Sequence, residues 1–155
     1  MVEFARYFMQ AEHGMSMSDI LMRLLIAAVL GIAIGTERQW RGHPAGIQTS
    51  SLVCFGAALY SLITPALGAA NDYRIVASIV TGVGFLAGGV ILKEGLSVTG
   101  LNTAATIWST AAVGALAGVG LWREAALAAF AIIALNLFFF PFTKWIDARV
   151  KSRQE

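Results

Sequence analysis

The residues best placed to do chemistry in this sequence are charged side chains beside long apolar stretches. The densest group lies within Gly35–Thr49, where Glu37, Arg38 and Arg41 follow an apolar run. If a helix continues past Gly35, Glu37 and Arg41 are four residues apart, which is the spacing of an ion pair on one helix face. Such a group could pair internally, hold an anion or line the entrance of an ion pathway. By composition alone it is equally an ordinary charged turn. A functional group and an ordinary turn both stay open as interpretations.

Other candidate polar residues lie near the ends of the apolar runs. Arg23 stands about one turn into the first run, with Asp19 four residues earlier, so we expect an interfacial pair in which Arg23 extends outward. Thr103 and Thr106 share a face at the start of a later run. Their hydroxyls could cap that helix, which is the simpler interpretation, or bond to a neighbouring helix. The remaining candidates are loop residues: Asp72, Arg74, Lys93 and Glu94.

A metal site is only weakly indicated. Mg²⁺ prefers oxygen ligands in octahedral geometry and usually engages one or two carboxylates. We expect Glu37 and Glu94 on one side of a membrane and Asp72 on the other, about 25 Å away, so one ion could bind only the first two. The metal therefore stays unknown, and no cofactor other than weakly supported Mg²⁺ is expected. His13 and His43 are also expected on opposite sides and no nucleophile–base pair stands out, so we do not expect an enzyme.

Five apolar stretches must position these residues. Hydrophobic residues make up 57% of the 155 residues and charged ones 13%, whereas a soluble domain carries about 25% charged residues. A membrane-spanning helix needs about 17–25 mostly apolar residues, and the stretches lack the alternation of barrel strands. We therefore predict an all-α polytopic membrane bundle of five transmembrane helices, at about Ile20–Gly35, Ile47–Leu67, Ile75–Leu92, Thr103–Leu121 and Ala125–Phe142.

The chain is expected to hold one membrane domain at residues 19–143. Residues 1–18 would form an N-terminal tail or interfacial helix, and residues 144–155 a basic cytoplasmic tail. Five crossings put the termini on opposite sides, and cytoplasmic loops carry an excess of Lys and Arg. The predicted topology therefore has the N-terminus outside and the C-terminus in the cytoplasm. This topology gives the cytoplasmic side seven basic residues, Arg38, Arg41, Lys93, Lys144, Arg149, Lys151 and Arg153, and the other side three, Arg6, Arg74 and Arg123.

Glycines recur at a spacing of four in three of the runs, which places them on one helix face and lets two backbones approach closely. We expect them to pack helices within the bundle or between two copies. Five short helices do not easily enclose a polar pathway, so we expect a homo-oligomer, with a two-fold dimer as the default. The glycine-dense third run could instead permit an unwound, cavity-lining segment. The expected packing residues are Gly31, Gly35, Gly82, Gly84, Gly88, Gly89, Gly114 and Gly118.

Several segments together resemble the MgtC/SapB family of bacterial inner-membrane proteins. They are Gly35–Thr49 (GTERQWRGHPAGIQT), Asp72-Tyr-Arg-Ile, Gly82–Ile91 (GVGFLAGGVI) and Val98–Trp108 (VTGLNTAATIW). Their order and spacing agree with the family across roughly Arg23–Gly120. Gln48 stands where the family usually has arginine and Asn102 where it usually has threonine. The missing arginine weakens the case for an anion site in the first loop.

The resemblance implies a multi-spanning inner-membrane protein associated with magnesium limitation and, in pathogens, with virulence. Some members are thought to restrain the membrane ATP synthase, and longer members carry a soluble C-terminal domain that we do not expect here. Our leading hypothesis is a regulator acting through contacts with membrane partners such as ATP synthase, with the lipid bilayer but no nucleic acid as a further partner. The alternative is an oligomeric transporter or channel for a small solute or an ion such as Mg²⁺, with Glu37, Asp72 and Thr103 at an entry or gate.

Overall fold

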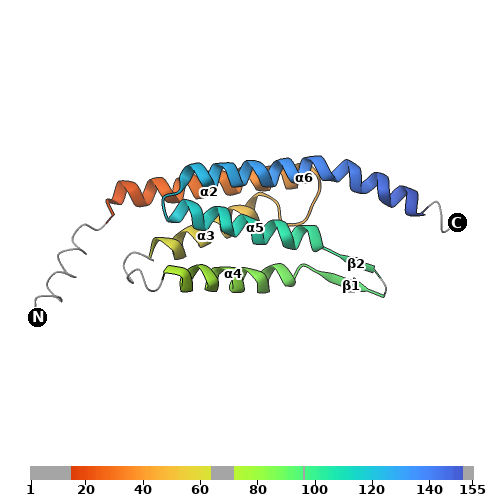
Figure 1. The fold of residues 1–155 in the computed structure, drawn as a ribbon, viewed down its shortest axis with the longest axis horizontal. Helices are drawn as coiled ribbons and strands as arrows, with labels where there is room; N and C mark the ends of the chain where they lie inside the picture. Colours follow the sequence, from red (N-terminus) through yellow and green to blue (C-terminus); the bar gives the residue numbers. More distant parts are fainter. Residues whose placement is uncertain (1–14, 64–71, 96, 152–155) are drawn as a thin grey trace, which may run out of the picture.

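The computed structural model describes residues 15–63, 72–95 and 97–151. These residues form five helices and one short β-hairpin (Figure 1). The elements are α2 (Met17–Trp40), α3 (Ile47–Leu62), α4 (Asp72–Gly88), β1 (Leu92–Glu94), β2 (Ser97–Thr99), α5 (Leu101–Gly118) and α6 (Trp122–Lys151). The predicted helical class is confirmed, with the hairpin as an unpredicted addition. The N-terminal tail predicted at residues 1–18 lies mostly outside the described residues.

Consecutive helices run in opposite directions along the long axis of the molecule (Figure 1). The turn at residues 41–46, the hairpin and the C-terminal end of α6 therefore lie toward one end, which we call the hairpin end. The start of α2 and the turn between α5 and α6 lie at the opposite end. This alternation brings the sequence motifs at residues 37–46 and 101–108 to the same end of the bundle.

Helix α5 lies at the centre, because it packs against each of the other four helices. The core around it is built from small side chains, among them Ala27, Cys54, Ala58, Val113 and Ala117, which are at most 1% exposed. Small residues let neighbouring backbones approach closely, so packing contacts replace the bulky hydrophobic core of a soluble domain.

Two of the helices are long and apolar enough to cross a membrane, namely α2 and the segment Trp122–Phe139 of α6. The segments Ile47–Leu62 and Arg74–Gly88 are apolar but shorter. The number of crossings and the orientation stay predictions. Helix α6 runs without a break through Lys151, so residues 144–151, which we expected to begin a separate tail, prolong the last helix.

The boundary predicted at Leu92 for the third apolar run is wrong, because α4 ends at Gly88 and the chain enters the hairpin. Strands β1 and β2 are antiparallel, with Lys93 paired to Val98. Gly100 closes the hairpin with φ +87°, and a Cβ there would collide with the carbonyl of Val90. Only glycine fits both the left-handed backbone and this close approach.

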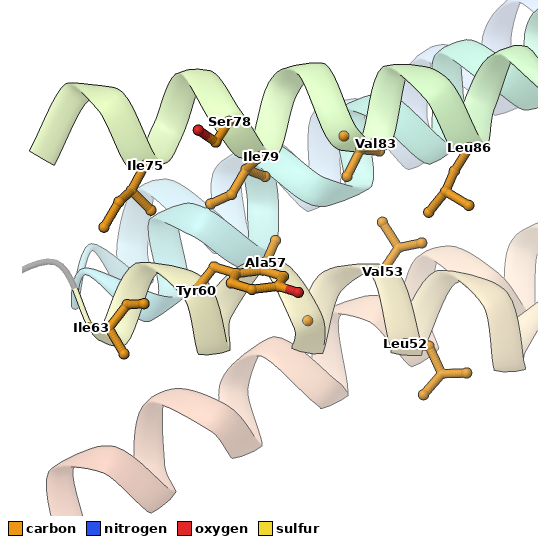
Figure 2. Close-up of a pocket in the computed structure, with 12 residues that line it drawn as sticks. Leu52, Val53, Ala57, Tyr60, Ile63, Ile75, Ser78, Ile79, Val83 and Leu86 are labelled. Atoms are coloured by element: carbon orange, nitrogen blue, oxygen red, sulfur yellow. The ribbon is translucent and has the colours of Figure 1, made fainter.

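Helix α4 leaves an apolar groove of about 550 Å³ against α3 (Figure 2). Gly82 lies on the groove side of α4. Two residues further on, about 200° around the helix, Gly84 lies on the opposite side. An exposed strip of four small residues, which we call the small-residue face, follows that side at spacings of four, three and four: Ala77, Thr81, Gly84 and Gly88.

Candidate functional site

The candidate site is a polar network at the hairpin end, and Arg38 is its centre. Helix α2 continues past Gly35 to Trp40, which carries Arg38 into the space between the first turn and α5. Arg38 is only 1% exposed. A buried guanidinium must have its N–H groups satisfied by acceptors within the protein, since water cannot reach it.

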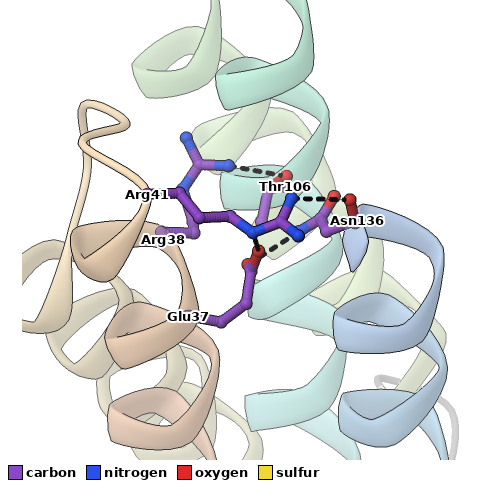
Figure 3. A network of polar contacts seen from close by, with 5 residues as sticks. All are labelled: Glu37, Arg38, Arg41, Thr106 and Asn136. Atoms are coloured by element: carbon purple, nitrogen blue, oxygen red, sulfur yellow. Dashed lines mark hydrogen bonds and ion pairs between the residues drawn. The ribbon is translucent and has the colours of Figure 1, made fainter. Parts of the chain in front are cut away.

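The acceptors come from two different elements. On α5, Thr106 Oγ1 accepts from Arg38 Nη1 at 3.1 Å (Figure 3) and Thr103 Oγ1 accepts from Nη2 at 2.8 Å. In the first turn, the Pro44 carbonyl accepts from Nη2 at 2.7 Å and the Ala45 carbonyl from Nε at 3.1 Å. The fork of the guanidinium thus ties α2, the turn and the start of α5 together.

This arrangement decides between the two interpretations of the threonines. No side chain caps the N-terminus of α5. Thr103 and Thr106 instead bind Arg38, and Thr106 also donates to the Asn102 carbonyl of its own helix at 2.9 Å. The turn fits around the guanidinium through an unusual backbone, because Ala45 has φ +60°, a region that non-glycine residues seldom adopt.

A second set of contacts joins α2 to α6. Glu37 and Arg41 form an ion pair of 3.0 Å between Oε1 and Nε, with the Glu37 side chain only 9% exposed. Arg41 Nη1 donates to the Asn136 carbonyl at 3.1 Å, and Asn136 Nδ2 lies 3.4 Å from Glu37 Oε2 (Figure 3). Sequence reasoning missed Asn136. The available signal was a lone amide inside an otherwise apolar run.

Arg23 lies at the other end of the molecule. Its Nη1 donates to the Gly118 carbonyl in the last turn of α5 at 2.9 Å, where the helix dipole favours a cation. The ion pair expected between Asp19 and Arg23 does not form. The ion pair found among the described residues is Glu37–Arg41. Gly120, with φ +90°, leaves room for the guanidinium, because a Cβ there would lie 2.9 Å from Arg23 Nη2.

The other charged candidates are not drawn into the network. Lys93 and Glu94 are exposed on β1 and Arg74 is exposed on α4, while Asp72 begins α4 with its side chain outside the described set. The two carboxylates suggested as a metal pair therefore lie in different surroundings. The Glu37 side chain is only 9% exposed, whereas Glu94 is exposed on β1. Across residues 15–63, 72–95 and 97–151, no three His, Cys, Asp or Glu side chains cluster as metal ligands would.

The expected packing glycines fall into two groups. A Cβ on Gly31 would lie 2.8 Å from Ser51 Cα, and one on Gly118 would lie 2.6 Å from the Ala58 carbonyl oxygen. Cβ atoms on Gly35 and Gly114 would come even closer to the backbone of α3, so α3 packs tightly between α2 and α5. In contrast, Cβ atoms at Gly82, Gly84 and Gly88 would meet nothing within 4 Å, and one at Gly89 would meet only carbonyls of its own helix. These four glycines therefore do not pack against another helix of the same chain, and packing between two copies, the other expected use, stays a prediction.

Comparison with known proteins agrees with the motifs that this site contains. The model of the MgtC family matches residues 24–145. Protein slr0014 of Synechocystis sp. is 48% identical over 134 residues, 86% of this chain and 57% of that protein. Protein MgtC of Salmonella typhimurium is 44% identical over 126 residues, 81% of this chain and 54% of the relative. Protein MgtC of Brucella abortus is 44% identical over 128 residues, 82% of this chain and 54% of the relative.

The chain thus spans about half the length of the curated relatives it matches. No solved structure matches it. The matched region includes every residue of the Arg38 network, from Glu37 to Asn136.

Proposed function

This chain belongs to the MgtC family, and from that premise we propose that it is a bacterial inner-membrane regulator that acts through lateral contacts with other membrane proteins. Family membership and two apolar helices already make it an MgtC-like membrane protein. The regulatory role, the inner membrane and the partner are the proposed part. The same proposal includes a role during magnesium limitation. It also includes a role in virulence if the bacterium that carries the protein is a pathogen.

The observation that carries the proposal is the small-residue face of α4. Four small residues line it, and Cβ atoms added at Gly84 and Gly88 would meet nothing in the chain. In a membrane, such a face lets a second helix approach closely and gain packing contacts that lipid tails cannot give. Phe85, which is 84% exposed beside this face, adds an aromatic side chain for a partner to pack against.

The polar network supports the same function. Arg38, Thr103 and Thr106 are used in bonds within the chain, and Glu37 pairs with Arg41. Together with the bonds of Asn136 they join α2, α5 and α6, and α4 takes no part in them. We take ATP synthase as the first candidate partner, and a second copy of the chain as the other.

Substitution of Gly84 by leucine tests this proposal, because it fills the small-residue face without disturbing any contact within the chain. The chain would be purified in mild detergent, and its mass and co-purifying membrane proteins measured. We expect the wild-type chain to retain a partner and the Gly84→Leu chain to lose it. Gly82→Leu is the matched control, since Gly82 is equally open but lies on the groove side.

The alternative of an ion transporter is tested with the same material. Purified protein would be placed in liposomes and Mg²⁺ entry recorded with a trapped dye. Flux that is abolished by Glu37→Ala would contradict the regulator and favour transport. Equal partner retention by the wild-type and Gly84→Leu chains would also count against the proposal.

A further inference from the structure

Helix α6 is longer than the membrane-length segment within it. The helix has 30 residues, from Trp122 to Lys151, which is about 45 Å at a rise of 1.5 Å per residue. The hydrocarbon core of a bilayer is about 30 Å thick, and the apolar segment Trp122–Phe139 is the part of α6 that fits it. Residues 140–151 extend the helix beyond that segment, and we call them the α6 arm.

A proline stands at the start of this arm. Pro141 has no backbone N–H, so it cannot donate the helical hydrogen bond to the carbonyl of Leu137, four residues earlier. Proline inside a helix is a usual cause of a kink, and the end of α6 leaves the line of the first part of the helix (Figure 1). The missing bond makes this the point at which α6 changes direction most easily.

Contacts from α2 hold α6 immediately before the proline. Arg41 Nη1 donates to the Asn136 carbonyl at 3.1 Å, and Asn136 Nδ2 lies 3.4 Å from Glu37 Oε2 (Figure 3). Asn136 precedes Pro141 by little more than one helical turn. Glu37, Arg41 and Asn136, which we call the latch, thus fix the last turn of the membrane-length segment to α2.

The latch is weaker than the Arg38 network beside it. Arg38 makes four hydrogen bonds of 2.7–3.1 Å, whereas the amide contact of the latch is 3.4 Å long. Glu37 Oε1 is buried and has no hydrogen-bond partner among the described residues, although it lies 3.0 Å from Arg41 Nε. A buried polar atom without a hydrogen bond costs free energy. Opening the latch lets water reach this oxygen, so the loss of the closed contacts is partly offset.

We propose that Pro141 is a hinge and that the latch selects the direction of the α6 arm. With the latch closed, α2 holds α6 up to the proline, and the arm keeps the direction seen in Figure 1. With the latch open, the last turn before the proline tilts and the arm takes a second direction. The coupling is reciprocal, so a contact that favours the second direction of the arm also opens the latch. This device uses no residue of α4 and does not depend on the proposed partner contact.

Distance measurements between two spin labels test the proposal in the full chain. Cys54→Ala removes the native thiol, Lys151→Cys places one label at the end of the arm, and Leu101→Cys places the other on α5, where the side chain is 58% exposed. Pulsed electron paramagnetic resonance of this chain in lipid nanodiscs should give one main distance. Arg41→Met removes the charged donor to α6, and we expect it to raise the share of a second distance by about tenfold or more.

Three further chains make the test specific. Asn136→Leu removes only the amide contact, so we expect a smaller rise, of about threefold, and it replaces Arg41→Met if that chain does not accumulate. Arg74→Met is the matched control, because Arg74 is exposed on α4, and it should leave the distances unchanged. Pro141→Ala restores the missing N–H, so Arg41→Met should no longer produce the second distance in that background.

Three results would overturn the proposal. The first is an even mixture of distances in the wild-type chain, and the second is an unchanged distribution in both Arg41→Met and Asn136→Leu. The third is a second distance that keeps its share when Pro141→Ala is combined with Arg41→Met, because the arm would then move without the hinge. None of these results bears on the partner test with Gly84→Leu, which concerns α4 alone.

Discussion

Substitution of Arg38 by methionine should destabilise this protein far more than the same substitution at an exposed arginine. Methionine keeps most of the buried volume but removes all four hydrogen bonds of the guanidinium. The Pro44 carbonyl then loses its charged donor, at about 1–3 kcal/mol for a buried group left unsatisfied, while the Ala45 carbonyl keeps only the 3.5 Å contact from Ser50 Oγ. Relief from burying a charge offsets part of this cost, so we expect a net loss of about 2–4 kcal/mol.

The measurement is unfolding in mixed micelles, followed by circular dichroism as a denaturing detergent is titrated into a mild one. Arg74→Met is the control, since Arg74 is exposed on α4, and we expect its effect to stay within about 0.5 kcal/mol. Arg38→Lys should lie between them at about 1–2 kcal/mol, because one ammonium cannot span acceptors on both the turn and α5.

A double-mutant cycle makes the test specific. Thr106→Val should cost about 1 kcal/mol in the wild-type background, because it removes the acceptor of Arg38 Nη1. In the Arg38→Met background it should cost much less. The reasoning is refuted if Arg38→Met is no more destabilising than Arg74→Met, or if the cost of Thr106→Val is the same in both backgrounds.

Three further predictions concern the helix contacts. Gly114→Leu should prevent stable folding, because its Cβ would collide with the Cys54 backbone; protease resistance of the purified chain checks this, with Gly84→Leu as the tolerated counterpart. Gly120→Ala should cost about 1–2 kcal/mol in the unfolding titration, because φ is +90° there; no loss would show that the turn relaxes freely. Glu37→Gln should cost about 1 kcal/mol, because it removes the charge that pairs with Arg41, and an equal cost in an Arg41→Met background would speak against this ion pair.

The fold shows where local pattern is informative and where it is not. Long apolar runs predict helices because their backbone groups can be satisfied locally. The end of α4 could not be predicted, since Val90, Ile91 and Leu92 continue the apolar run while the chain has already left the helix at Gly88. A short apolar segment fits a helix or a strand equally well, and the choice rests on Gly95 and Gly100 with their positive φ values.

The candidate site, like the fold, could be predicted from the sequence only in part. Glu37 and Arg41 are neighbours on one helix, so their spacing alone suggested a pair. Arg38 is bonded to residues 65 and 68 positions away, and its other acceptors are backbone carbonyls, which every residue carries. No sequence pattern distinguishes the carbonyls of Pro44 and Ala45 from the rest. Only the antiparallel return of the chain places them around one guanidinium.

Composition and spacing alone determined the helical class and the presence of close-packing glycines, because these depend on hydropathy and on contacts between neighbours along one helix. The family followed from the resemblance of several sequence motifs and their order along the chain. The tertiary structure alone decided which glycines are used within the chain: Gly31 and Gly114 meet α3, while Gly82 and Gly84 meet nothing. The motifs look alike in sequence. They differ in use because a glycine on a helix face acts through whatever packs against that face. Only the folded structure determines whether this is another backbone, a lipid or a partner.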